Sequence, residues 1–219
     1  MSPLKVMVIR HAEKPDGTGG VLGVDEAGRP DPNQLCVRGW QRAGALVRFF
    51  APASGDFAEG IATPSAIFAC KPYGAANSVR PFSTVSPLAK ALGIHVNHEI
   101  GKRDMCALLH AVMNSQGTVL ICWSHKLLPS IIRGVAGELP GLPAEWPANR
   151  FDLVWVLDRT GAGWKFYQVG QLLLPGDAPP IEPQRRIALA SERWVGIRGS
   201  VAYFQTYLAR RYTQKRGSS

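Results

Sequence analysis

Short apolar segments alternate with amphipathic ones along this chain, and this alternation is the feature that most restricts its fold. Residues 4–9 and 118–123 are short apolar runs rich in branched side chains, which is typical of strands buried on both faces of a parallel sheet. Segments with apolar residues at helical spacing lie between and after them, at 38–50, 81–92, 102–113 and 127–135. The alternation predicts an α/β fold with a mostly parallel central sheet flanked by helices on both faces.

Shorter segments complete this pattern. Further strands are expected at 66–69, 94–96, 151–157 and 164–169, the last two joined by a turn at 160–163. Pro87 lies inside a predicted helix and is expected to kink it or split it in two. A chain of 219 residues suits one domain. We therefore expect a single domain over residues 1–219, with a long loop at 14–36 and a basic C-terminal extension from about residue 175.

Composition narrows the class of protein. Apolar residues make up 46% of the chain and charged residues 19%, as in ordinary globular proteins. No run approaches the roughly 18 apolar residues that cross a bilayer, and no leader pattern precedes the first predicted strand. We therefore expect a cytoplasmic protein without a membrane span. Its four cysteines are scattered without close pairing, which favours free thiols over disulfides.

The formal charge of +9 is unevenly distributed. Residues 181–219 hold eight Arg or Lys residues against two acidic ones. A basic balance favours an anionic substrate or partner. Apolar and aromatic residues of this tail recur at helical spacing, at Val201, Phe204, Leu208 and Tyr212. That spacing favours a helix packed on the domain and argues against nucleic-acid binding, which needs aromatic residues exposed beside the basic ones.

Two of the predicted strands end in a histidine. Arg10-His11 follows the first strand, and Ser124-His125 follows the strand at 118–123. Ligands of open α/β sheets bind beyond the carboxyl ends of the strands. Arg80 stands at the start of a predicted helix, where free backbone N–H groups favour an anion. Two arginines and two histidines at one edge predict a phosphate pocket, since the planar guanidinium pairs with phosphate oxygens.

Four segments occur in a characteristic order between residue 4 and about residue 137. They are Arg10-His11-Ala12-Glu13, Arg38-Gly39-Trp40-Gln41-Arg42-Ala43, Ser78-Val79-Arg80-Pro81-Phe82-Ser83-Thr84 and Ser124-His125. In that order they resemble the Arg-His-x-x, Thr-x-x-Gly-x-x-Gln-Ala, Ser-x-x-Arg-Ala-x-x-Thr and Ser-His segments of the histidine phosphatase superfamily. The resemblance implies the phosphoglycerate mutase-like fold of that family, with three layers. It also implies chemistry that needs no metal ion and no cofactor.

The resemblance implies a role for each matched residue. His11 would be the nucleophile that becomes phosphorylated, in its neutral form. Arg10, Arg80 and His125 would bind the phosphoryl group and neutralise its charge in the transition state. Glu13 and Ser124 are expected among the substrate-binding residues.

A carboxylic acid would protonate the leaving oxygen and later accept a proton from water. Glu99 is the preferred residue for this role, because it follows a predicted strand and precedes Gly101. Glu13 and Asp104 are the alternatives.

The predicted activity is hydrolysis of a phosphomonoester through a phosphohistidine on His11. A phosphoglycerate-type mutase and a non-catalytic phosphate-binding module of the same fold are the alternatives. A different chemistry is suggested by Cys36, which begins a Cys-x-x-Gly-x-x-Arg pattern. Leu35 precedes it and Ala43 follows the arginine, which departs from cysteine-dependent phosphatases, and no buried strand leads into it. His95 and His98 are three apart on a predicted strand and so face opposite sides, which argues against a metal site.

Overall fold

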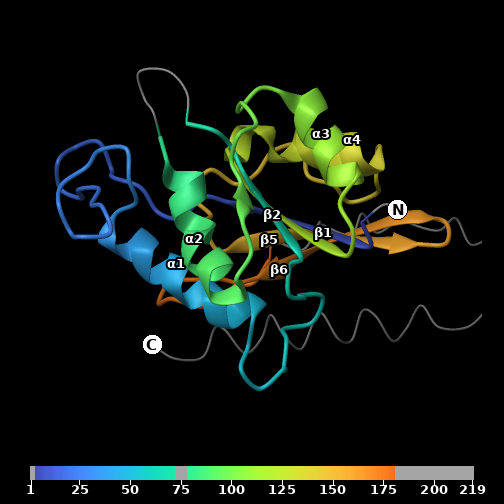
Figure 1. The fold of residues 1–219 in the computed structure, drawn as a ribbon, viewed down its shortest axis with the longest axis horizontal. Coiled ribbons are helices and arrows are strands. Elements are labelled where there is room, and N and C mark those ends of the chain that lie inside the picture. The colour runs from blue at the N-terminus through green and yellow to red at the C-terminus, as the bar shows by residue number, and fades with distance from the viewer. Residues whose placement is uncertain (1–2, 73–77, 181–219) are drawn as a thin grey trace, which may run out of the picture. The chain divides into compact units, whose positions relative to one another are not determined.

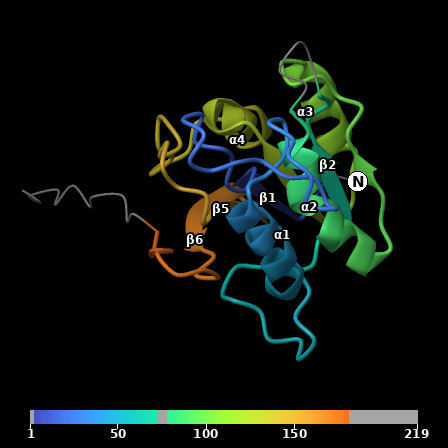
Figure 2. The ribbon, with the colours of Figure 1, turned by 90° about the vertical axis from the view of Figure 1, so that its left-hand side faces the viewer.

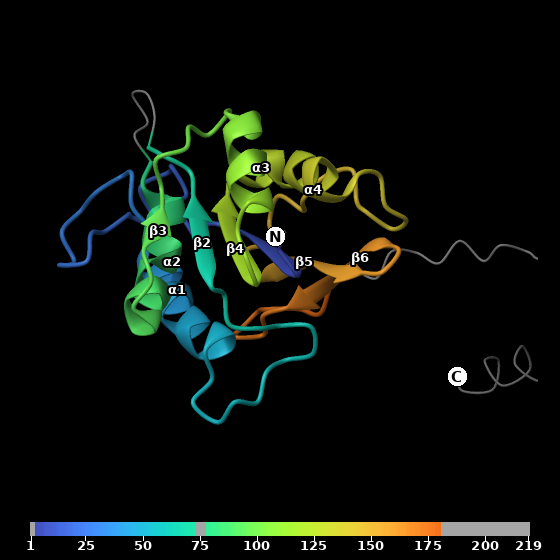
Figure 3. The ribbon, with the colours of Figure 1, turned by 45° about the vertical axis from the view of Figure 1, so that its right-hand side comes forward.

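A six-stranded sheet forms the centre of the computed structural model, which describes residues 3–72 and 78–180. The strands are β1 (Lys5–Arg10), β2 (Ala66–Ala69), β3 (Val96–Asn97), β4 (Thr118–Trp123), β5 (Leu153–Thr160) and β6 (Gly163–Gly170). Their order across the sheet is β3-β2-β4-β1-β5-β6. The first four in this order run parallel, and β5 and β6 continue the sheet in antiparallel pairing (Figure 3). The predicted mostly parallel sheet is therefore confirmed.

Helices cover both faces of the sheet, which confirms the three layers. In the described part of the chain they are α1 (Val37–Phe50), α2 (Arg80–Leu92), α3 (Met105–Met113) and α4 (Leu128–Ala136), with a short 3-10 turn, His125–Leu127, before α4. Figures 1 and 2 show α1 and α2 together on one face and α3 and α4 on the other.

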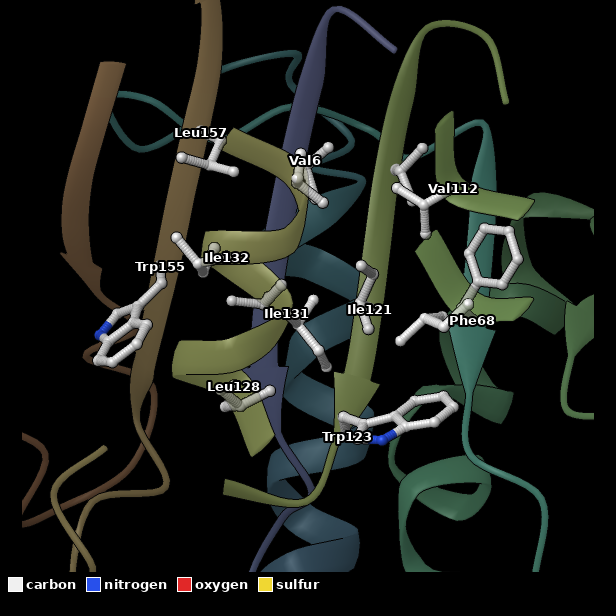
Figure 4. Close-up of a cluster of buried hydrophobic side chains, with 14 of the residues drawn as sticks. Val6, Phe68, Val112, Ile121, Trp123, Leu128, Ile131, Ile132, Trp155 and Leu157 are labelled. Atoms are coloured by element: carbon white, nitrogen blue, oxygen red, sulfur yellow. The ribbon is translucent and has the colours of Figure 1, made fainter. Parts of the chain in front are cut away.

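Each face has its own buried core. Alternate residues of β1 point to opposite sides, so Val6 packs in the core beneath α3 and α4 while Met7 packs in the core beneath α1 and α2. Figure 4 shows Leu128, Ile131 and Ile132 of α4 lying over the first of these cores. Burial on both faces explains why the β1 and β4 segments are apolar runs rather than alternating patterns.

Two expectations need correction. Of the two outcomes expected for Pro87, the split does not occur, because α2 continues past it to Leu92; the kink stays a prediction. The carbonyl of Ser83, which would lack an N–H donor because of Pro87, accepts the hydroxyl of Ser86 at 3.3 Å instead. The third helix begins at Met105 rather than at residue 102, because the Asp104 side chain caps it by accepting the Ala107 N–H at 3.1 Å.

The described residues belong to one compact unit, Met1–Pro183. The predicted helix with Val201 and Tyr212 lies outside the described residues, so the single-domain prediction over 1–219 stays a prediction. Within 3–72 and 78–180, every helix is too short or too polar to cross a bilayer.

Candidate active site

The ends of β1 and β4 bring the two predicted histidine segments together. The strands pair in parallel with Arg10 opposite Trp123, and the His11 N–H lies 3.4 Å from the Trp123 carbonyl oxygen. His11 therefore begins the loop after β1 beside Ser124, the residue that follows β4. The carboxyl edge of the sheet places both segments at one location, as the parallel order predicts.

The His11 ring is held in one tautomer. Its Nδ1 lies 2.8 Å from the carbonyl oxygen of Ala12. A carbonyl only accepts, so Nδ1 carries the proton and Nε2 keeps its lone pair. Burial lowers the pKa of His11 to about 3, and the charges of Arg10 and Arg80 act in the same direction. At neutral pH the ring is therefore uncharged and lies among cations.

Thr84 ties this loop to the start of α2. Its side-chain oxygen accepts the Ala12 N–H at 2.9 Å and its hydroxyl donates to the Arg80 carbonyl at 2.7 Å. Thr84 is fully buried. The sequence pattern contains Thr84, but the hydrogen bond it makes to the loop after His11 is visible only in the fold. It links the peptide after His11 to the helical turn that carries Arg80.

Arg10 is buried, with a relative exposure of 3%. Its Nη1 donates to the carbonyls of Ala148 and Arg150, and its guanidinium carbon lies 3.8 Å from the centre of the Phe151 ring. Burial lowers the pKa of Arg10 to about 10, which leaves it cationic at neutral pH. The segment 148–151, in which sequence analysis identified no candidate functional residue, therefore helps to set the position of this cation.

Two buried nitrogens at this location lack a partner. Across residues 3–72 and 78–180, the buried side-chain nitrogen and oxygen atoms without a hydrogen bond are Arg10 Nε and His125 Nδ1. Burial and the charge of Arg10 lower the pKa of His125. Buried polar groups are nearly always paired, and an unpaired one costs about 1–3 kcal/mol. A bound anion would supply the missing partner for a nitrogen that donates.

The long loop predicted at 14–36 engages Arg80. The Arg80 Nε donates to the Gln34 carbonyl at 3.1 Å, and Nη2 donates to the Pro32 carbonyl at 2.6 Å. The loop, blue in Figure 1, lies beside the start of α2. Within residues 3–72 and 78–180, Nη1 of Arg80 forms no hydrogen bond, so it is available to a ligand.

A cavity of about 620 Å³ opens beside His11. Arg80 and Ser124 line it, together with Lys71 and the segment 101–104. Arg10 and His125 are not among its lining residues. His11, Arg80 and Ser124 are thus the predicted site residues that face this space.

The three predicted carboxylates occupy different surroundings. Glu13 binds Arg42 at 2.8 Å and Arg38 at 3.2 Å. The Glu99 side chain is 69% exposed and lies 3.1 Å from the Lys71 ammonium, whose hydrogen bond and charge lower the pKa of Glu99. Neither Glu13 nor Glu99 lines the cavity, whereas Asp104 does.

The pairing of Glu13 has a structural consequence. Arg42 is 2% exposed and also binds Asp177 at 2.7 Å, so Glu13 joins the loop after His11 to α1 and to the segment after β6. A Cβ atom on Gly39 would lie 2.3 Å from the Glu13 carbonyl oxygen. The glycine in the second motif segment is therefore required for this close approach.

Two other sequence candidates lie away from the cavity. Cys36 precedes α1 and is buried, and its thiol does not line the cavity. The rings of His95 and His98 have centroids 6.0 Å apart. In the described ranges, no three His, Cys, Asp or Glu side chains are grouped so that they could hold a metal ion.

Comparisons with known proteins add structural neighbours. Neither a protein-family model nor a curated protein sequence matches this chain. SixA from Agrobacterium tumefaciens, described as a candidate phosphohistidine phosphatase, has a TM-score of 0.44 and 17% identity over 75% of this chain and 96% of its own. A mycobacterial glucosyl-3-phosphoglycerate phosphatase has a TM-score of 0.45 and 11% identity, covering 76% and 97%.

An ecdysone phosphate phosphatase from Bombix mori, solved with tungstate, has a TM-score of 0.43 and 12% identity, covering 81% and 94%. All three are described as phosphatases. With TM-scores below 0.5 and identities below 20%, these similarities assign neither an activity nor a substrate to this chain.

Replacing Thr84 with Val removes the acceptor of the Ala12 N–H. A buried N–H without a partner costs about 1–3 kcal/mol, so we expect a loss of that size in the free energy of unfolding, measured by urea denaturation. Thr84→Ser keeps the hydroxyl and is the matched control, expected to lose less. Equal losses for the two variants would show that the methyl group, and not the hydrogen bond, stabilises this turn.

The half-buried, neutral His11 should make stability depend on pH. Its folded pKa of about 3 lies below its ordinary value of 6.5, so between these values the unfolded chain binds a proton that the native protein does not. The stability that the protein gains from a neutral His11 is fully present above pH 6.5 and declines as the pH falls toward 3. When the pH falls from 7.5 to 4.5, we expect wild type to lose more free energy of unfolding than His11→Asn, as measured by denaturant titrations. The control is His95→Asn, which replaces an exposed histidine; a shift equal to the control's would contradict the expectation.

Proposed function

We propose that this protein is a phosphatase that hydrolyses a phosphomonoester through a phosphohistidine on His11, without a metal ion. The observation that carries the proposal is that, in the described part of the chain, the two buried nitrogens without partners belong to Arg10 and His125, next to a neutral histidine. Keeping Arg10 charged and buried is costly. A phosphoryl group, with several acceptor oxygens and negative charge, is the ligand that offsets this cost.

In the first step, the lone pair on His11 Nε2 attacks phosphorus and the bond from phosphorus to the ester oxygen breaks. The leaving oxygen takes a proton from a carboxylic acid and departs as an alcohol. Arg10, Arg80 and His125 stabilise the charge on the phosphoryl oxygens during transfer. The Nδ1 proton, held by the Ala12 carbonyl, stabilises the positive charge that develops on the ring.

In the second step, water gives a proton to the carboxylate and attacks phosphorus. The phosphorus–nitrogen bond breaks, inorganic phosphate leaves, and the electron pair returns to Nε2. The same carboxyl group therefore serves as acid and then as base, and the enzyme regains its starting state.

We assign the carboxyl role to Asp104. Its support is that Asp104 lines the cavity with His11, whereas Glu13 is engaged by Arg42 and the pKa of Glu99 is lowered by Lys71. A general acid must be protonated when the leaving oxygen departs, which disfavours a carboxylate that pairs with a lysine.

The intermediate is directly detectable. Incubation with a ³²P-labelled phosphomonoester, followed by a rapid quench, should give protein-bound label that acid removes and base does not. His11→Ala should lose both the label and turnover, while His95→Ala should retain them. Label on His11→Ala equal to wild type, or no label and no turnover across a panel of phosphomonoesters, would refute the proposal.

The acid assignment is tested by leaving-group dependence. For an alkyl phosphate, Asp104→Asn should lower kcat by about 10²–10⁴, the usual contribution of a general acid. For p-nitrophenyl phosphate, whose leaving group needs no proton, Asp104→Asn should lower the rate of phosphohistidine formation far less. Glu99→Gln is the matched control and should not show this difference between substrates. The reverse pattern in the two variants would assign the role to Glu99.

A further inference from the structure

The cavity beside His11 is larger than a phosphoryl group requires. Pockets of about 300–1,000 Å³ hold whole small molecules, and this one has about 620 Å³. It therefore has room for the leaving group of a phosphomonoester as well as for its phosphate. The residues that line the remaining space determine which leaving groups bind well.

The lining of this space is strongly cationic. Besides Arg80, the lining includes three more basic residues, Lys71, Lys102 and Arg103. Among the described lining residues, the only carboxylate is that of Asp104. Lys71 is paired with Glu99 outside the cavity lining. Lys102 and Arg103 form no ion pair with any residue of 3–72 or 78–180. Lys102 and Arg103, both exposed at the cavity wall, are thus two neighbouring cations without an ion-pair partner in this part of the chain.

The backbone that carries these two cations is anchored. The Trp123 indole N–H donates to the Lys102 carbonyl at 3.0 Å, and Trp123 is 1% exposed at the end of β4. The Asp104 N–H donates to the Gly101 carbonyl at 2.9 Å, and the Lys71 N–H donates to the Ile100 carbonyl at 2.8 Å. The cations therefore project from a main chain fixed to the same strand end that carries Ser124.

We infer that the leaving group of the substrate carries a second anionic group, a carboxylate or a second phosphate, which Lys102 and Arg103 bind. The inference rests on the proposed function for the position of the transferred phosphate. His11 and Arg80 then hold one end of the substrate, and the loop 101–104 holds the other. Neutral phosphomonoesters fill the first of these subsites only.

Matched substrates test this subsite. We would compare kcat/KM for phenyl phosphate with that for 3-carboxyphenyl phosphate, 4-carboxyphenyl phosphate and 1,4-phenylene bisphosphate. At least one doubly anionic ester should be preferred about threefold to tenfold, as expected for two partly solvated charge pairs. Which ester is preferred distinguishes a carboxylate from a phosphate. Ratios within about twofold of one for all three esters would overturn the inference.

Two double variants locate the effect. Lys102→Ala/Arg103→Ala should reduce the preference for doubly anionic esters to near one. Arg48→Ala/Lys90→Ala removes the same charge from the last turns of α1 and α2, and Lys90 lies about 15 Å along α2 from Arg80. This control should keep the preference. An equal loss in both variants would mean that net charge, and not the loop 101–104, selects the substrate.

A binding measurement separates failure of this inference from failure of the proposed function. Benzylphosphonate and its 3- and 4-carboxy derivatives cannot be hydrolysed, and their Kd values are obtained by calorimetry on wild type and on Lys102→Ala/Arg103→Ala. Tighter binding of a carboxylated ligand to wild type alone supports the subsite even if no ester is turned over. Equal Kd values for the three ligands overturn it even if His11 becomes phosphorylated.

Discussion

The parallel pairing of β1 with β4 is the constraint on which the rest of the site depends. Because Arg10 lies opposite Trp123, both strands end at the same level, and the loops that follow them begin side by side. Their side chains are buried on both faces by two separate cores, so a shift of one residue in register would move each side chain into the opposite core, where its shape does not match the packing. The cost of such a shift is what keeps His11 beside Ser124.

Around this strand end, several polar side chains are held by hydrogen bonds to the main chain of distant segments. The segment 148–151 holds Arg10, the long loop at 14–36 holds Arg80, and Thr84 joins the loop after His11 to α2. Arg10 and Arg80 use some of their N–H donors in these bonds, so only the remaining donors are available to a ligand. This arrangement fixes the positive charges of Arg10 and Arg80 next to His11 before any ligand binds.

The fold was largely readable from the chain, since its strands and helices differ clearly in the period of their apolar residues. The runs at 66–69 and 118–123 coincide with β2 and β4. The exceptions are local: Pro87 is accommodated by the hydroxyl of Ser86, and Asp104 delays the start of α3. Both depend on single side-chain hydrogen bonds, which periodicity does not reveal.

By itself, the sequence determined the α/β pattern and the placement of His11 and His125 after buried strands, because short-range periodicity and strand ends are encoded locally. Only the tertiary structure decided which carboxylate faces the cavity. Glu13, Glu99 and Asp104 are equivalent as residue types, and their surroundings differ through Arg42, Lys71 and the cap of α3. The role open to a carboxylate depends on the charges packed against it, and these come from segments far away in the chain.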